Sequence, residues 1–190
     1  MKKLLHVIGA RPNFVKAAPI IKQIKQDKIL KQTVVHTGQH FDSDMSGSFL
    51  KQLNIGKPNH QLTLKSKTAN SQICEISSKL EDIVKRCKPC AIVVYGDVNS
   101  SLAGAITAKN LNVKLVHVES GLRSFDKDMP EEKNRIVIDH LSDLHFVTEK
   151  SGIQNLLNEN ISKSSVHHVG NTMIDSLATF FEAEHDFTPP

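Results

Sequence analysis

The architecture is clearest in two stretches of the sequence, Ala91-Ile92-Val93-Val94-Tyr95-Gly96-Asp97 and Lys114-Leu115-Val116-His117-Val118-Glu119. In each stretch, a short and mostly apolar run comes directly before a carboxylate. Runs of this length are typical of strands that are buried on both faces of a parallel sheet. In an open α/β sheet, the residues just past the carboxyl ends of the strands line the ligand crevice. Asp97 and Glu119 are therefore candidates for an acid or a base in an active site.

Strands and helices alternate on both sides of these stretches. The expected strands are 4–8, 32–36, 91–95, 114–118, 143–147 and 165–169, and the expected helices are 14–24, 47–53, 70–87, 100–111, 130–141, 150–159 and 172–184. Pro19 lies inside the first helix and predicts a kink or a helix start near that point. Helices between strands imply right-handed βαβ units. The sequence therefore predicts an α/β fold with a doubly wound, mostly parallel, Rossmann-like sheet.

The composition favours one large globular domain. The chain has 190 residues, of which 39% are hydrophobic and 23% are charged. We expect a Rossmann-like domain over residues 1–175, followed by a terminal helix and linker over residues 176–190 that lead toward a second domain.

The same composition excludes several classes of partner. There is no Trp and only one Tyr, and the net charge of +4 comes from scattered lysines, so we expect no nucleic-acid partner. No apolar stretch reaches the roughly 18 residues of a membrane span, so we expect no membrane partner. The apolar run 4–8 is short and is followed by Arg11, which favours a cytoplasmic first strand over a signal peptide.

The three cysteines indicate neither a disulfide framework nor a metal centre. Cys87 and Cys90 match a C-x-x-C pattern, but they fall at the end of a predicted helix, whereas a redox pair sits at a helix start. A zinc site would need further ligands at metal spacing, and the sequence has no second such motif. We interpret these residues as ordinary thiols and expect no metal.

Polar side chains also follow the first two predicted strands. Arg11 and Lys16 come after the first strand, and Gln39 and His40 come after the second. Two cations near a helix start are explained if an anion, most simply a phosphate, binds there. The alternative is that Arg11 only braces one of the carboxylates. Neither the G-x-G-x-x-G fingerprint nor the Walker pattern is present, which argues against a dinucleotide cofactor or a P-loop.

A third carboxylate, Glu131, follows Pro130 in the first turn of a predicted helix. Carboxylates are favoured there in any helix, and Glu131 forms an i,i+4 pair with Arg135. Its position one loop after Glu119 nevertheless makes it a candidate for the same site. His117 alternates with two valines, so we expect a buried histidine with satisfied hydrogen bonds rather than a ligand.

Over essentially its whole length, the chain resembles the non-hydrolysing UDP-N-acetylglucosamine 2-epimerases. The resemblance rests on motifs in family order at residues 9–12 with Lys16, 38–40, 96–97, 117–123, 130–135 and 169–175. It implies the amino-terminal half of a GT-B-type two-domain fold. It also implies epimerisation at C2 of UDP-N-acetylglucosamine to UDP-N-acetylmannosamine, by elimination of UDP to a 2-acetamidoglucal and re-addition of UDP. Family members are cytoplasmic and usually dimeric, and they supply UDP-N-acetylmannosamine for the synthesis of surface polysaccharides.

The resemblance also assigns roles to residues. The carboxylates with acid–base roles would be Asp97, Glu119 and Glu131, with the C2 base left open. The residues expected to bind the substrate are Arg11, Lys16, Gln39, His40 and Arg135, the last of which would orient Glu131. The chemistry needs no redox cofactor and no metal.

Two features depart from the family pattern. The chain stops where a second domain would start, so we expect little turnover and weak UDP binding from these 190 residues alone. Asp42 stands where the segment used for allosteric activation would carry a glutamine, which argues against such activation.

Several alternatives stay open. One is a C2 epimerase of a UDP-linked 2,3-diacetamido-glucuronic acid, because the loop 124–130 suits either branch. A hydrolysing relative is disfavoured by residues 9–13. A GT-B glycosyltransferase would fit the fold but leave the third carboxylate unexplained. The last alternative is a non-catalytic module that binds nucleotide sugars or dimerises.

Overall fold

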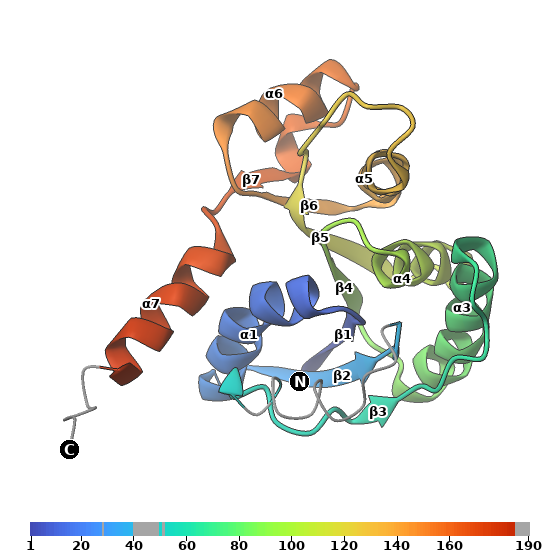
Figure 1. Cartoon of the computed structure of the whole chain (residues 1–190), viewed down its shortest axis with the longest axis vertical. Coiled ribbons are helices and arrows are strands. Elements are labelled where there is room, and N and C mark those ends of the chain that lie inside the picture. Colours follow the sequence, from blue (N-terminus) through green and yellow to red (C-terminus); the bar gives the residue numbers. More distant parts are fainter. Residues whose placement is uncertain (28, 40–49, 51, 185–190) are drawn as a thin grey trace.

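The computed structural model describes residues 1–27, 29–39, 50 and 52–184, which form one sheet flanked by helices (Figure 1). The strands are β1 (Lys2–Ile8), β2 (Leu30–His36), β3 (His60–Gln61), β4 (Ala91–Tyr95), β5 (Lys114–Ser120), β6 (Leu144–Val147) and β7 (Val166–His168). The helices are α1 (Arg11–Gln26), α3 (Ala69–Cys87), α4 (Asn99–Asn110), α5 (Pro130–Leu141), α6 (Lys150–Asn158) and α7 (Thr172–Glu184), with a 3-10 turn η1 (Lys163–Ser165).

The strand order is β3-β2-β1-β4-β5-β6-β7, and each neighbouring pair is parallel. The direction of winding reverses between β1 and β4, which makes this position the topological switch point of the sheet. Ligands of open α/β sheets bind outside the carboxyl ends of the strands at such a point. The predicted doubly wound, Rossmann-like sheet is confirmed.

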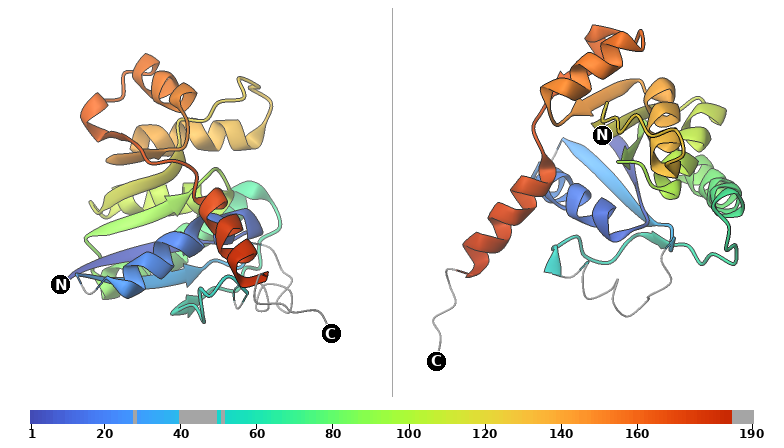
Figure 2. Two further views of the ribbon diagram at one scale, coloured as in Figure 1. Left: turned by 90° about the vertical axis from the view of Figure 1, so that its left-hand side faces the viewer. Right: turned by 45° about the horizontal axis from the view of Figure 1, so that its top comes forward.

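Strand β4 carries the core on both of its faces. Ile92 and Val94 belong to the apolar cluster that includes α3 and α4, whereas Val93 and Tyr95 belong to the cluster that includes α1. All four side chains are buried. Because both faces are covered, β4 is a continuous apolar run rather than an alternating one. Figure 2 shows the helices on both sides of the sheet.

The start of α1 corrects one expectation. The helix does not begin near Pro19 but at Arg11, and it continues past the proline to Gln26. Proline has no N–H to donate to the carbonyl of Val15, one turn earlier. That carbonyl instead accepts a hydrogen bond from the Ser176 hydroxyl of α7 at 2.6 Å. A tertiary contact therefore compensates the lost helical hydrogen bond.

The remaining boundaries follow the sequence with small changes. The short strand β3 was not predicted, and the last strand is limited to residues 166–168, after the turn η1. The expected helix at 47–53 falls largely outside the described residues. None of the helices in the described ranges combines the length and the apolar character that a bilayer crossing needs.

Helix α7 packs against α1 and extends away from the rest of the molecule (Figures 1 and 2). Its outer face exposes three apolar side chains, Met173, Ile174 and Leu177, which are 42%, 65% and 55% exposed. Residues of α1 and α7 and residues 52–54 line a cavity of about 120 Å³. The predicted domain boundary at residue 175 lies inside this helix.

Candidate active site

Glu119 occupies a strained bulge at the end of β5. Its φ is +67°, and the pairing of β5 with β6 shifts between Val118 and Ser120. Bulges re-aim side chains, and a left-handed backbone is uncommon outside glycine, asparagine and aspartate. The bulge turns the Glu119 carboxylate toward α1, where Oε1 accepts a hydrogen bond from Lys16 Nζ at 2.7 Å. These side chains are only 13% and 8% exposed, so the ion pair is largely removed from water.

Gly96, directly after β4, lies against this ion pair. Its φ is +56°, and a Cβ at this position would lie 2.8 Å from Lys16 Nζ and 3.8 Å from Glu119 Oε1. A side chain here would therefore meet the ion pair and would also strain the backbone. Glycine lets the end of β4 approach the lysine and the glutamate from β5.

Asp97 is held by residues of α5. Its Oδ2 lies 2.6 Å from an Arg135 guanidinium nitrogen, and its backbone carbonyl accepts a hydrogen bond from Asn134 Nδ2 at 2.7 Å. Burial opposes the charge on Arg135, but Asp97 and Glu132 hold the pKa of its guanidinium above the ordinary value.

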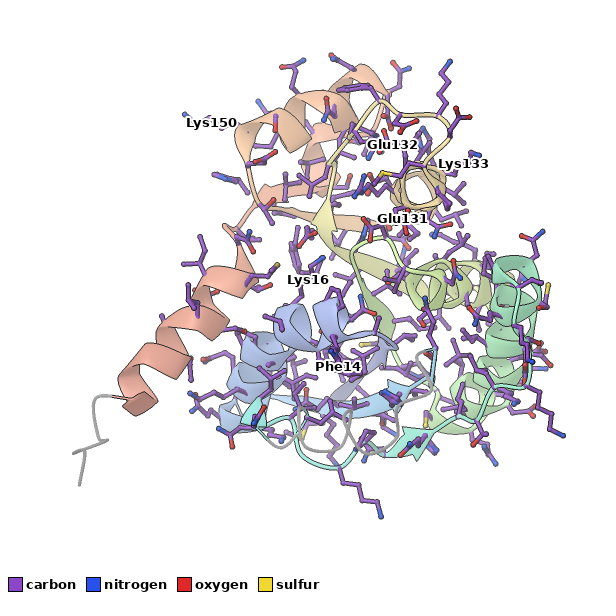
Figure 3. The ribbon with its side chains drawn as sticks, in the orientation of Figure 1. Phe14, Lys16, Glu131, Glu132, Lys133 and Lys150 are labelled. Atoms are coloured by element: carbon purple, nitrogen blue, oxygen red, sulfur yellow. The ribbon has the colours of Figure 1, made fainter. Side chains whose placement is uncertain are left out.

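Glu132, rather than Glu131, is the neighbour that pairs with Arg135. The distance from Arg135 NH1 to Glu132 Oε2 is 3.0 Å. The expected pair between Arg135 and Glu131 is therefore wrong for the described structure, because the i,i+3 residue points toward the guanidinium. Glu131 is exposed, and Figure 3 shows it on the side of α5 that faces α4, whereas Lys133 lies on the outer side.

The buried Glu132 also fixes the loop that precedes α5. Its two oxygens accept hydrogen bonds from the backbone N–H groups of Ser124 and Phe125, at 2.9 and 3.0 Å. Burial opposes ionisation, but these bonds and Arg135 keep the pKa of the Glu132 carboxyl below its usual value. The loop is thereby linked through Glu132 and Arg135 to Asp97.

The predicted substrate-binding residues differ in their surroundings: some are held by hydrogen bonds and one is exposed. Gln39 Oε1 accepts hydrogen bonds from the backbone N–H and the hydroxyl of Ser100, at 3.0 and 2.6 Å. It thereby caps the start of α4, whose own N-cap residue is a valine with no capping side chain. Arg11 is exposed at the first residue of α1. His40 lies outside the described residues.

Asn13 is a residue of the site that sequence reasoning missed. It is fully buried, accepts a hydrogen bond from the Gly9 N–H at 3.3 Å, and donates one to the Tyr95 carbonyl at 2.7 Å. It therefore joins the ends of β1 and β4 at the switch point. An asparagine on the core-facing side of an amphipathic helix was the available signal, because such groups stay buried only when hydrogen-bonded.

His117 is buried and satisfied, as predicted. Its Nδ1 lies 2.7 Å from Asp139 Oδ1, and its Nε2 lies 3.0 Å from the Gly96 carbonyl oxygen. Asp139 was not predicted. Its spacing from Glu132 and Arg135 places all three on one side of α5, and this inward polar stripe was the signal in the sequence.

The cysteines are free thiols, and the Cys87–Cys90 segment lies between α3 and β4 at the end of a helix, as expected. Within the described ranges, no group of three or more His, Cys, Asp or Glu side chains is placed to hold a metal ion.

The chain is thus a Rossmann-like α/β domain that carries ion-paired carboxylates at its topological switch point, where nucleotide-binding enzymes of this architecture bind their ligands. Residues 22–188 match the family model of UDP-N-acetylglucosamine 2-epimerase. The chain belongs to the UDP-N-acetylglucosamine 2-epimerase family.

Two relatives and one solved structure illustrate the match. A UDP-N-acetylglucosamine 2-epimerase homolog of Methanococcus maripaludis is 43% identical over 92% of this chain and 48% of its own length. The UDP-2,3-diacetamido-2,3-dideoxy-D-glucuronate 2-epimerase of Pseudomonas aeruginosa is 44% identical over 94% and 51%. The Methanocaldococcus jannaschii UDP-GlcNAc 2-epimerase, solved with UDP-GlcNAc and UDP, aligns with a TM-score of 0.92 and 35% identity over 97% and 51%. The chain thus spans about half the length of the relatives it matches.

Proposed function

We propose that this chain supplies the acid–base part of a site that epimerises C2 of UDP-N-acetylglucosamine, giving UDP-N-acetylmannosamine. The observation that carries the proposal is the gathering of Glu119, Lys16 and Asp97 at the β4 and β5 ends, next to the switch point. Its support from relatives is the solved Methanocaldococcus jannaschii homologue with UDP-GlcNAc and UDP bound.

The reaction divides into two balanced halves. A carboxylate removes the C2 proton, the electron pair forms the C1–C2 double bond, and the C1–O bond to UDP breaks with its electrons on the phosphate. In the second half, UDP attacks C1 again and a carboxylic acid returns a proton to the opposite face of C2. The candidates for these transfers are Asp97, Glu119 and Glu131, because general acid–base catalysis needs carboxyl groups within hydrogen-bond reach of the reacting atom.

The cations have two roles in this proposal. Lys16 and Arg135 each neutralise one carboxylate, so the charges can lie close together away from water. Arg11, at the exposed start of α1, is the candidate for binding a substrate phosphate.

We further propose that the protein works as a cytoplasmic homodimer and needs no cofactor, as the resemblance implies.

A second substrate is favoured by one specific observation. The relative named UDP-2,3-diacetamido-2,3-dideoxy-D-glucuronate 2-epimerase is 44% identical to this chain, which is as similar as the UDP-N-acetylglucosamine 2-epimerase homolog at 43% and more similar than two UDP-N-acetylglucosamine 2-epimerases at 38%. That sugar would undergo the same C2 inversion with the same carboxylates.

The test offers each sugar nucleotide separately to the 190-residue chain and to the longest polypeptide that its gene encodes. Proton NMR of the anomeric signals reports conversion to the manno epimer. We expect conversion of UDP-N-acetylglucosamine, and much slower conversion by the 190-residue chain than by a polypeptide that spans both halves of the relatives. Conversion of the diacetamido sugar alone would replace the first substrate by the second. Conversion of neither sugar by any form would contradict the proposal.

A further inference from the structure

The strained backbone at Glu119 is restrained from both sides by one buried carboxylate. A non-glycine residue persists at positive φ only where its surroundings over-determine it. Asp139 of α5 provides this restraint. Its Oδ1 lies 2.7 Å from Nδ1 of His117, two residues before Glu119, and its Oδ2 accepts a hydrogen bond at 3.1 Å from the N–H of Gly121, two residues after it.

The restraint extends to the end of β4 through the imidazole of His117. Its Nε2 lies 3.0 Å from the carbonyl oxygen of Gly96, whose own N–H donates to the Val118 carbonyl at 2.9 Å. Gly96 is also the residue whose Cα faces Lys16 and Glu119. Asp139 and His117, joined to each other, therefore contact two backbone groups near the ion pair, the N–H of Gly121 and the carbonyl of Gly96.

The protons in this network follow from its acceptors. A carbonyl oxygen can only accept, so Nε2 of His117 must donate to Gly96. An ionised carboxylate also only accepts, so Nδ1 donates to Asp139. Burial opposes ionisation of Asp139, but His117 and Arg123 hold the pKa of its carboxyl below the usual value. Arg123 lies 2.7 Å from Asp139 and 2.7 Å from Glu159, so this guanidinium faces two carboxylates.

We propose that Asp139 and His117 are positioning residues that set the direction of the Glu119 carboxylate from outside the active site. Their hydrogen bonds go to the backbone around Glu119 and to Gly96, not to the carboxylate itself. The expected effect on turnover rests on the proposed function. The expected effect on the backbone of the Glu119 bulge is independent of the proposed function.

The first experiment compares two aspartates, Asp139 and Asp143, that both accept hydrogen bonds from backbone N–H groups in or next to β5. Asp139→Asn removes the charge next to the bulge, whereas Asp143→Asn removes one at the other end of the strand, where Asp143 accepts a hydrogen bond from the Leu115 N–H at 2.8 Å. Amide hydrogen exchange is followed by NMR for Gly96, Ser120 and the helix α3. We expect exchange at Gly96 and Ser120 to rise at least about tenfold in Asp139→Asn only, as local opening predicts. Unchanged exchange in Asp139→Asn, or the same rise in Asp143→Asn, would overturn the proposal.

The second experiment needs no variant. Long-range proton–nitrogen spectra of the wild-type chain at neutral pH report whether each ring nitrogen of His117 carries hydrogen. We expect hydrogen on both nitrogens, because both face acceptors. A ring nitrogen without hydrogen could not donate a hydrogen bond to Gly96 or to Asp139, and this result would contradict the inference. His117→Gln is a further variant for the exchange experiment if Asp139→Asn does not fold.

The third experiment measures turnover in the longest polypeptide that the gene encodes. A misplacement of about 1 Å can lower a rate by about 100-fold, so we expect kcat of Asp139→Asn to fall by about that factor while KM stays within about threefold. A fall in kcat in Asp143→Asn of equal size would indicate general loss of structure and would overturn the positioning role. Wild-type protein without turnover would contradict the proposed function, while the exchange and nitrogen spectra would still decide the inference.

Discussion

The ends of β4 and β5 and the helix α7 use opposite kinds of side chain. At the strand ends, Glu119 and Asp97 are charged, mostly buried and ion-paired. On α7, Ile174 and Leu177 are apolar and more than half exposed. Buried charges persist only with partners, and exposed apolar groups gathered on one face are unusual for a surface. Partners within this chain therefore hold the carboxylates in place, whereas the exposed face of α7 has no such partners among the described residues.

The largest effect that this comparison predicts is the loss of a site carboxylate. Glu119→Gln keeps the shape of the side chain but cannot accept a proton, so we expect the rate of epimer formation to fall by about 10²- to 10⁴-fold. The matched control is Glu81→Gln, because Glu81 also pairs with a lysine, at 2.5 Å, but on the exposed surface of α3. Proton NMR of the sugar product measures both rates, and equal losses in the two variants would remove the distinction between site and surface.

A pH titration tests the buried polar groups beneath the site. His6 is fully buried next to Tyr95, and burial lowers its pKa from 6.5 to about 4. The folded protein therefore takes up this proton at lower pH than the unfolded chain, so the stabilisation is complete above pH 6.5 and is lost as the pH falls toward 4. We expect the free energy of unfolding to fall by up to about 3 kcal/mol across this window, because each pKa unit is worth about 1.4 kcal/mol.

Urea unfolding at several pH values measures this slope, and His6→Asn is expected to flatten it. A slope that is unchanged in His6→Asn would show that another group carries the pH dependence.

Alanine substitutions at two glycines with positive φ distinguish the cost of backbone strain from the cost of steric crowding. Gly96→Ala adds both strain and a contact 2.8 Å from Lys16 Nζ, whereas Gly170→Ala, just before α7, adds strain with no atom within 4 Å. We expect Gly96→Ala to lower the free energy of unfolding by about 1–3 kcal/mol and Gly170→Ala by about 1 kcal/mol. Thermal unfolding ranks the two, and an equal cost would mean that Lys16 moves away without loss.

The smallest effect is expected on α7. Leu177→Ala truncates a side chain that is 55% exposed, so we expect the free energy of unfolding to change by no more than about 0.5 kcal/mol. Leu156→Ala on α6 is the matched control, because Leu156 is fully buried and its truncation is expected to cost about 2–5 kcal/mol. A cost above about 2 kcal/mol for Leu177→Ala would indicate that this face is covered in solution, for example by a second copy of the chain.

Much of this arrangement could be predicted from the sequence. The apolar runs before Asp97 and Glu119 are strands buried on two faces, and the carboxyl ends of parallel strands meet at one edge, so both acids fall near the switch point. His117 was also correctly assigned as buried and hydrogen-bonded. These features depend on local pattern and on topology, which a sequence carries directly.

The details that orient the site could not be predicted. The bulge at Glu119 and the choice of Glu132 over Glu131 by Arg135 depend on contacts between segments far apart in the chain. The continuous helix through Pro19 likewise depends on the hydroxyl of Ser176, about 160 residues away. Helical spacing alone does not say which of two adjacent glutamates faces a guanidinium.

In the proposed reaction, the carboxylates at the β4, β5 and α5 positions exchange the C2 proton with solvent. Deuterium incorporation at C2 of UDP-N-acetylglucosamine in heavy water measures this exchange. We predict that the longest polypeptide of this gene replaces the C2 hydrogen by deuterium, and that Glu119→Gln does so at least about 100-fold more slowly. Epimer formed with its original C2 hydrogen intact, or exchange at the same rate without Glu119, would contradict proton transfer by these carboxylates.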